Sequence, residues 1–179
     1  MADEVDAPPP APAADAADDG AVAMAKAWVS AVMDERDMQK VWALTEPDYR
    51  KVLAQHWIMS KHPDVVGPPE QWEALACGLA AYPSGSRLWA QFARERLQRW
   101  REFWATFSAV TWGVRNRSDP RPDVAVVTFV EPRGKLMTLR PGPPLEFRHI
   151  AVRRTPDGWL VAGADGNNLF GPGWPPGPA

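Results

Sequence analysis

The chain has 179 residues, 45% of them hydrophobic, and a formal net charge of −2. This length suits one domain with one buried core, and so small a charge excludes an electrostatic argument for nucleic-acid binding. Cys77 is the only cysteine, which excludes an intrachain disulfide and a cysteine-based metal cluster.

The acidic residues are concentrated at the N-terminus. Six of them lie in residues 1–20, which hold no basic residue, so the rest of the chain has 20 basic and 16 acidic residues. We expect residues 1–20 to be a disordered acidic tail, because Ala, Pro and Asp offer almost nothing to bury. Residues 21–170 should form a single domain, followed by a flexible Pro- and Gly-rich tail at 171–179. Trp174 in that tail is either solvated or part of a short docking segment.

The N-terminal residues also bear on location. A signal peptide needs basic residues followed by an apolar run, and this chain begins with acidic residues and no such run. Nowhere do eighteen apolar residues follow one another, as a membrane-spanning helix requires. We therefore expect a soluble cytoplasmic protein without a membrane partner.

The first hundred residues have the periodicity of helices. Apolar residues at helical spacing predict helices over 21–35, 39–44, 70–80 and 86–104. Thr45 has the character of an N-cap, with Pro47 in the first turn, and predicts a further helix that ends near Met59. Between these helices, residues 61–69 form a loop in which 64–66 is a candidate short strand. Ser86 is the expected cap of the longest helix.

From residue 107 the period changes to two, which is typical of strands. A first strand carries Val110, Trp112, Val114 and Asn116 on one face, and residues 119–122 interrupt it. Two hairpins follow, 124–130 with 135–140 and 147–152 with 159–164. Thr155-Pro156-Asp157-Gly158 predicts the turn of the second hairpin, because Gly accepts the left-handed conformation that closes a bulged loop.

Helices first and an antiparallel meander afterwards predict an α+β fold, with helices packed on one face of a curved sheet. The opening helix, the segment WALTEPDYRKVLAQHWI (42–58) and the ending HIAVRRTPDGWLVAGAD (149–165) resemble the nuclear-transport-factor-2-like (NTF2-like, or SnoaL-like) superfamily. The resemblance implies a cone with a pocket between the helices and the concave face of the sheet. Such pockets serve isomerases, cyclases, hydrolases and dehydratases, and also non-catalytic binding domains, so the fold alone does not decide function.

Two residues of the 45–59 helix are candidates for the pocket. Tyr49 and His56 are seven residues apart and share one helical face, so both should point inward. A buried histidine has a lowered pKa and can act as a general base. The alternative is a core histidine whose ring nitrogens are satisfied by a carbonyl group or by Tyr49.

The last hairpin adds two more candidates. His149 either points into the same cavity or lies on the solvent face of the sheet, and Asp165 at the end of the last strand is either an acid–base group or a turn residue. The three histidines lack the spacing of a metal site, and the fingerprints of nucleotide-binding loops and of serine hydrolases are absent. We therefore expect no metal and no cofactor.

Ten tryptophans are a large number for this length. They either fill the core or line an aromatic pocket for an apolar or cationic ligand, to which Trp57 and Trp112 would contribute. The arginines of the longest helix, which are Arg87, Arg94, Arg96, Arg99 and Arg101, either form a solvated face or a docking surface for an acidic partner or for the acidic N-terminal tail.

Two hypotheses follow for function. The first is a non-catalytic domain that binds a small apolar ligand or a protein partner, with Tyr49, His56, Trp57, Trp112 and His149 as the ligand-binding residues. The second is a cofactor-free lyase, isomerase or hydrolase that uses His56, Tyr49 and either His149 or Asp165. Apolar residues on both faces of the last strands also predict a homodimer.

Overall fold

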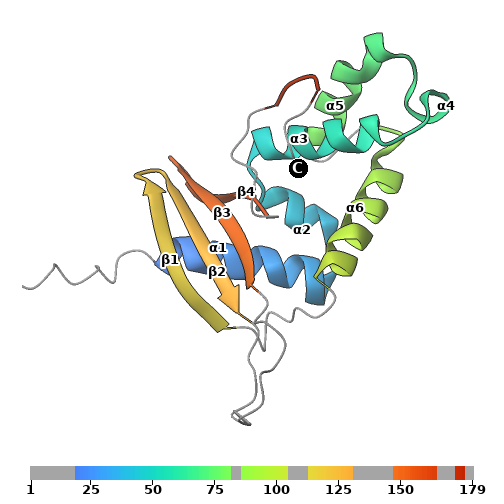
Figure 1. Cartoon of the computed structure of the whole chain (residues 1–179). Helices are drawn as coiled ribbons and strands as arrows, with labels where there is room; N and C mark the ends of the chain where they lie inside the picture. Colours follow the sequence, from blue (N-terminus) through green and yellow to red (C-terminus); the bar gives the residue numbers. More distant parts are fainter. Residues whose placement is uncertain (1–18, 82–85, 105–112, 131–146, 165–171, 176–179) are drawn as a thin grey trace, which may run out of the picture.

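The computed structural model describes residues 19–81, 86–104, 113–130, 147–164 and 172–175. Helices make up the N-terminal part of this structure and an antiparallel sheet the C-terminal part, so the α+β fold class is confirmed (Figure 1). None of the helices in these ranges is both long and apolar enough to span a membrane. Of the predicted disordered tail at 1–20, residues 1–18 lie outside the described residues, and residues 19 and 20 belong to the first helix.

The helical part follows the predicted order, with differences at the boundaries. The elements are α1 (Asp19–Ser30), the π-helical turn η2 (Ala31–Glu35), α2 (Met38–Ala43), α3 (Pro47–Met59), α4 (Pro63–Val66), the 3-10 turn η3 (Pro69–Gln71), α5 (Trp72–Ala80) and α6 (Trp89–Phe103). The helix predicted at 21–35 thus begins earlier, at Asp19, and ends as a π-helical turn. Arg36 terminates that turn in the left-handed conformation.

Two local predictions in this part are wrong. Thr45 does not cap α3, because its hydroxyl is used in the core, and Glu46 occupies the N-cap position ahead of Pro47. Residues 64–66 form a helical turn instead of a strand. The turn starts there because Pro63 is preset for a first helical position and the His62 ring accepts a hydrogen bond from the backbone N–H of Asp64.

The longest helix starts later than expected. The hydroxyl of Ser86 accepts a hydrogen bond from the backbone N–H of Leu88 at 3.3 Å. That bond forms a turn before the helix, and α6 itself begins at Trp89.

The sheet contains β1 (Gly113–Arg121), β2 (Val124–Val130), β3 (Phe147–Thr155) and β4 (Gly158–Gly163), hydrogen-bonded in that order and all antiparallel. The predicted turn at Pro156–Gly158 is confirmed, with Gly158 at φ +127°. The predicted interruption of the first strand is wrong for residues 119–121. The strand tolerates Pro120 because it lies at the edge of the sheet that the described strands form and its register shifts between Ser118 and Arg121. The predicted strand 135–140 lies outside the described residues.

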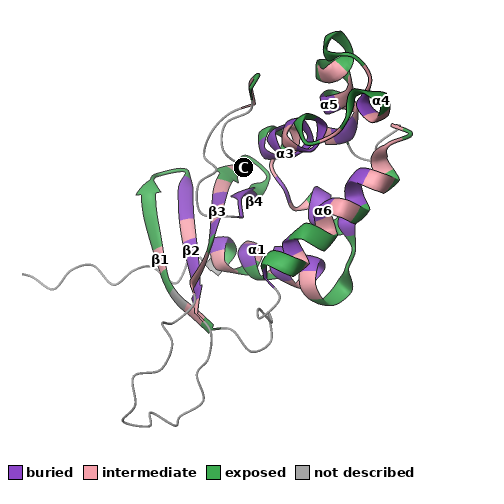
Figure 2. Ribbon diagram, turned by 45° about the vertical axis from the view of Figure 1, so that its right-hand side comes forward, coloured by how far each residue is buried: buried purple, intermediate pink, exposed green. Residues whose placement is uncertain are grey.

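Helix α1 packs against one face of the sheet, where it contacts β2, β3 and β4. Val127, Ile150, Val152 and Val161 form the buried centre of that face. The register pairs Val127 with Ile150 and Val152 with Val161, so these four side chains share one side of the pleat. Figure 2 shows that most residues of β2 are buried, whereas most residues of the neighbouring strand β1 are exposed.

Tryptophan side chains fill much of the core between the helices. Trp28, Trp42, Trp100 and Trp104 are at most 1% exposed. Trp28 meets Trp100 and Trp104 edge to face, at ring-centroid distances of 4.9 Å and 5.6 Å. This geometry aligns a positive ring edge with a negative ring face. Core filling is therefore confirmed for these four tryptophans.

A short segment between α2 and α3 joins the helices to the sheet. The backbone of Leu44 and Glu46 pairs with Val161 in β4 through two hydrogen bonds of 2.9 Å and 2.8 Å. Thr45 between them is fully buried. Its hydroxyl donates to the carbonyl of Val41 at 2.6 Å and accepts from the indole N–H of Trp28 at 2.9 Å.

This arrangement predicts a large effect for Thr45→Val. Valine fits the same space but leaves the Trp28 indole and the Val41 carbonyl without their partner in the core. The free energy of unfolding, measured in urea, should fall by about 1–3 kcal/mol. The control Thr155→Val removes only an exposed turn bond to the carbonyl of Gly158 and should change that energy by about 0.5 kcal/mol or less. Equal losses in the two variants would contradict the assigned role of Thr45.

Candidate functional site

The residues predicted on α3 have different surroundings. Tyr49 is 2% exposed, and its hydroxyl oxygen accepts a hydrogen bond from the backbone N–H of Ala164 at 3.2 Å. This bond holds the end of β4 against α3. His56, on the same helical face, is half-buried near the C-terminal end of the helix.

Trp57 points toward α6, where it belongs to a polar cluster centred on Glu95. The Glu95 carboxylate accepts hydrogen bonds from the Trp57 indole at 2.8 Å, from the Gln91 amide at 2.9 Å and from the Lys61 ammonium group. Burial raises the pKa of Glu95, but these bonds outweigh it and lower the pKa to about 2. A carboxylate with three donors is a stable anchor between helices and a poor proton acceptor.

His149 does not lie near Tyr49 and His56 of α3. It lies on the solvent side of the sheet. It is exposed, and its Nδ1 atom is 3.0 Å from the hydroxyl of Thr128, its cross-strand partner on β2. The neighbouring positions on β3, Ile150 and Val152, point to the α1 side. Trp112 and Asp165 lie outside the described residues.

These positions determine what the predicted residues can do chemically. An acid–base enzyme needs two groups that converge on one open site. Among the described candidates, the Tyr49 hydroxyl is engaged with backbone and His149 is on the opposite side of the sheet from α1. In the part of the chain that the structure describes, no three His, Cys, Asp or Glu side chains are placed to hold a metal ion.

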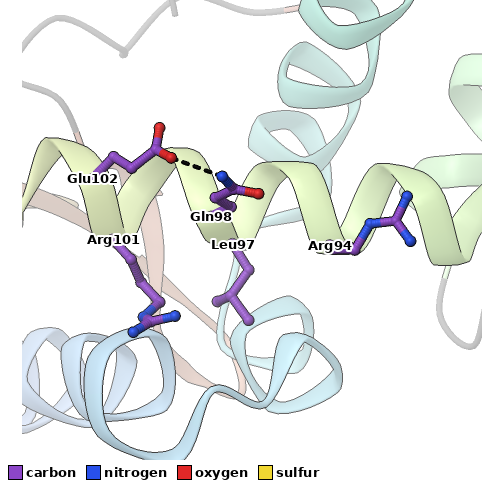
Figure 3. Close-up of a pocket in the computed structure, with 5 residues that line it drawn as sticks. All are labelled: Arg94, Leu97, Gln98, Arg101 and Glu102. Carbon is purple, nitrogen blue, oxygen red and sulfur yellow. Dashed lines mark hydrogen bonds between the residues drawn. The ribbon is translucent and has the colours of Figure 1, made fainter.

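Three of the pockets are lined by described residues, and His56 lines none of these three. One has a volume of about 520 Å³ and runs along α6 between Arg94, Leu97 and Arg101. Figure 3 shows Leu97 and Arg101 on the same side of the helix, away from the Gln98–Glu102 hydrogen bond.

The predicted solvated arginine face of α6 is only partly solvated, because Arg96 is 7% exposed and its guanidinium lies over the Trp100 ring. A second pocket, of about 470 Å³, lies between α5 and the start of α6.

The third pocket is the most aromatic, and we call it the aromatic groove. It lies beside α3 and α5, has a volume of about 440 Å³, and is lined by Met59, Pro69, Trp72, Glu73, Trp174 and Pro175. Met59 at its edge is 48% exposed, a large value for an apolar side chain. The groove therefore combines open apolar surface with a carboxylate at the rim.

Trp72 forms the fixed wall of the groove. Its indole N–H donates to the carbonyl of Gly67 at 2.9 Å, which holds the ring orientation. Gly67 has φ +82°, and a Cβ atom there would lie 2.9 Å from the side-chain oxygen of Gln71. Only glycine adopts this conformation at low cost, so the turn before α5 depends on Gly67.

The C-terminal segment Pro172–Pro175 forms one wall of the groove. Trp174 packs on Trp72 at a ring-centroid distance of 5.7 Å, and its indole N–H donates to Glu73 at 2.8 Å. The backbone N–H of Gly173 donates to the side-chain oxygen of Gln55 at 3.2 Å. Gln55 is 1% exposed, so a buried side chain of α3 is satisfied by the backbone of this segment.

Glu73 is held in place from the other side as well. Its second oxygen accepts a hydrogen bond from Lys51 at 2.5 Å. The Lys51 and Trp174 bonds lower the pKa of Glu73, so the carboxylate stays charged at neutral pH. The sequence offered one signal for this site, a tryptophan set among prolines, but Gln55 and Glu73 gave none.

Comparisons of the chain with protein-family models, with curated proteins and with solved structures found no match. The functional argument therefore depends on the geometry of the described residues.

The Glu95 cluster predicts a pH-dependent effect for Glu95→Gln. Because the pKa of Glu95 is lower in the folded chain than the usual 4.5, its contribution is complete above pH 4.5 and is lost as the pH falls toward 2. At pH 7 the variant should lose about 1 kcal/mol of unfolding free energy, a figure reduced for the partly exposed pair. At pH 2.5 the difference from the unmodified chain should be much smaller.

Urea unfolding at the two pH values measures this effect. The control Glu102→Gln changes a carboxylate of the same helix whose partner is the exposed amide of Gln98, and it should be nearly neutral at both values. A Glu95→Gln deficit that stays constant between pH 7 and pH 2.5 would contradict the electrostatic origin of the effect.

Proposed function

We propose that this chain is a non-catalytic binding domain with an NTF2-like arrangement of helices and sheet, which takes a small apolar ligand or a protein partner. The observation that carries the proposal is the aromatic groove, in which Trp72, Met59 and Pro69 leave apolar surface open beside Trp174. Ligand sites commonly combine such apolar walls with a few placed polar groups, which here are Glu73 and Gln55.

The enzymatic hypothesis receives less support from the same structure. Tyr49 and His149 each have a hydrogen-bond partner within the fold and lie in different surroundings. Trp57, which would contribute to an internal aromatic pocket, instead donates its indole N–H to Glu95, and Trp28 and Trp100 pack on one another. A binding role at the surface needs neither a convergent proton donor nor an internal cavity.

Methionine-methyl NMR tests the proposal at the groove itself. With 13C-labelled methionine methyl groups, a set of uncharged apolar ligands that includes indole and N-acetyl-tryptophanamide should shift the Met59 signal, assigned with Met59→Leu. Met38, which is 8% exposed on α2, serves as the internal control and should not move. Trp72→Ala should weaken the response to indole about tenfold, because the fixed aromatic wall is lost. Ligands that leave Met59 unmoved, or that lose their effect in His56→Ala instead, would contradict the groove as the site.

We also propose that two copies associate through the sheet face opposite α1. Val126, Ala151 and Leu160 lie on that face and are half-buried within one copy, so a partner copy would cover further apolar surface.

Light scattering at tens of micromolar, on the order of ordinary weak dimer affinities, should give about twice the chain mass of 19.8 kDa. Val126→Glu should reduce this to a monomer, whereas Ala23→Glu on the exposed side of α1 should leave the dimer intact. Circular dichroism checks that both variants are folded. A monomeric mass for the unmodified chain would contradict this part of the proposal.

A further inference from the structure

The segment Pro172–Pro175 is held in the manner of a bound peptide. It has three separate points of attachment, which are a ring contact with Trp72, a side-chain hydrogen bond to Glu73 and a backbone hydrogen bond to Gln55. The three attachments involve an aromatic surface, an indole N–H and a peptide N–H. The groove therefore recognises both the backbone and the side chain of the segment.

Gln55 is the most informative of these partners. A glutamine that is 1% exposed needs its hydrogen bonds satisfied, because an unpaired polar group in such a position is costly. Its oxygen is satisfied by the N–H of Gly173, which comes from the far end of the chain. A small apolar molecule without an N–H group cannot replace that donor, whereas any peptide backbone can.

The aromatic wall and the prolines indicate which peptide fits. Prolines restrict the backbone of a segment before binding, so such a segment loses less conformational entropy when it docks on an aromatic surface. Here Trp174 stands between Pro172 and Pro175, and Pro175 itself lines the groove together with Pro69. The carboxylate of Glu73 selects an indole over a phenyl ring, since only the indole has an N–H to donate.

We propose that the surface formed by Gln55, Trp72 and Glu73 is a recognition site for a protein partner that carries a proline-flanked tryptophan, and that the chain's own segment Pro172–Pro175, which forms one wall of the aromatic groove, occupies this surface in cis. This inference rests on the proposed binding function and names its partner class. The cis segment acts as a tethered competitor, so a partner binds only by displacing Trp174. Because Trp174 is 40% exposed, the segment covers the site without being part of the core.

Competition between the tethered and the free segment gives a quantitative expectation. A tethered segment has an effective concentration of about 1 mM, and a free peptide with a dissociation constant of about 0.1 mM then binds the unmodified chain about tenfold more weakly than a chain whose groove is open. Trp174→Ala in the full chain provides that open groove while leaving α3 and α5 unchanged.

The probe is a fluorescently labelled, terminally blocked peptide with the sequence of residues 171–179, and binding is followed by fluorescence anisotropy. The expected result is binding to Trp174→Ala about tenfold tighter than to the unmodified chain. The control Phe103→Ala removes an aromatic side chain that is 52% exposed on α6 and should bind like the unmodified chain. A peptide with alanine in place of tryptophan should not bind either protein.

Two further measurements place the peptide in the groove. Glu73→Ala combined with Trp174→Ala should weaken binding about three- to tenfold, the range expected for the loss of one ordinary hydrogen bond at an exposed site. Binding should also change little between 50 mM and 500 mM salt, because the blocked peptide is uncharged and Glu73 is already paired with Lys51. A steep salt dependence would contradict binding at this uncharged contact and overturn the proposal.

The remaining outcomes separate this inference from the proposed function. Equal peptide affinity for the unmodified chain and Trp174→Ala would show that the cis segment does not compete, and would overturn the inference. No peptide binding to Trp174→Ala at 1 mM, on the order of the effective concentration above, together with apolar ligands that still shift Met59, would overturn the inference and leave the proposed function standing. If neither the peptide nor the ligands act at Met59, both proposals fail.

Discussion

The contact between the Leu44–Glu46 segment and β4 is the constraint on which the rest of the structure depends. β4 is the last strand of the described sheet, and its outer edge would expose unpaired backbone groups. Two hydrogen bonds to Val161 cover part of that edge, and Thr45 in the same segment binds Trp28 of α1. One three-residue segment therefore fixes the edge of the sheet, the helix across its face and the starting point of α3.

An ion pair next to this segment strengthens the same contact. Glu46 accepts a hydrogen bond from Arg153 of β3 at 2.6 Å. Burial raises the pKa of Glu46, and the charge and hydrogen bond of Arg153 act against that effect. A partly buried pair of this kind contributes position more than stability, because desolvation offsets much of the attraction. The pair holds the N-terminal end of α3 against the sheet. The orientation of the whole helix therefore follows from the contact between the Leu44–Glu46 segment and the sheet.

The sequence predicted the parts of this fold that depend on local chemistry. The turn at Pro156–Gly158 and the strand Val124–Val130 follow from turn residues and β-branched residues, and both are confirmed. The prediction of Thr45 as an N-cap is wrong because the sequence alone does not distinguish a capping hydroxyl from a buried one. Only the distant Trp28 decides between them. The aromatic groove could not be predicted for the same reason, since Gln55 and its partner Gly173 are 118 residues apart along the chain, a pairing that no local pattern contains.

The three faces of α3 explain why a binding site can form on this helix without disturbing the core. At about 100° per residue, Tyr49, Gln55 and Trp57 point in three different directions. Tyr49 binds β4, Trp57 binds Glu95 on α6, and Gln55 faces the C-terminal segment. The first two contacts hold the helix rigidly whether or not the third is made. A partner that displaces Trp174 therefore meets a helix that is already in place, and the free energy of binding is not reduced by reorganisation of the helix.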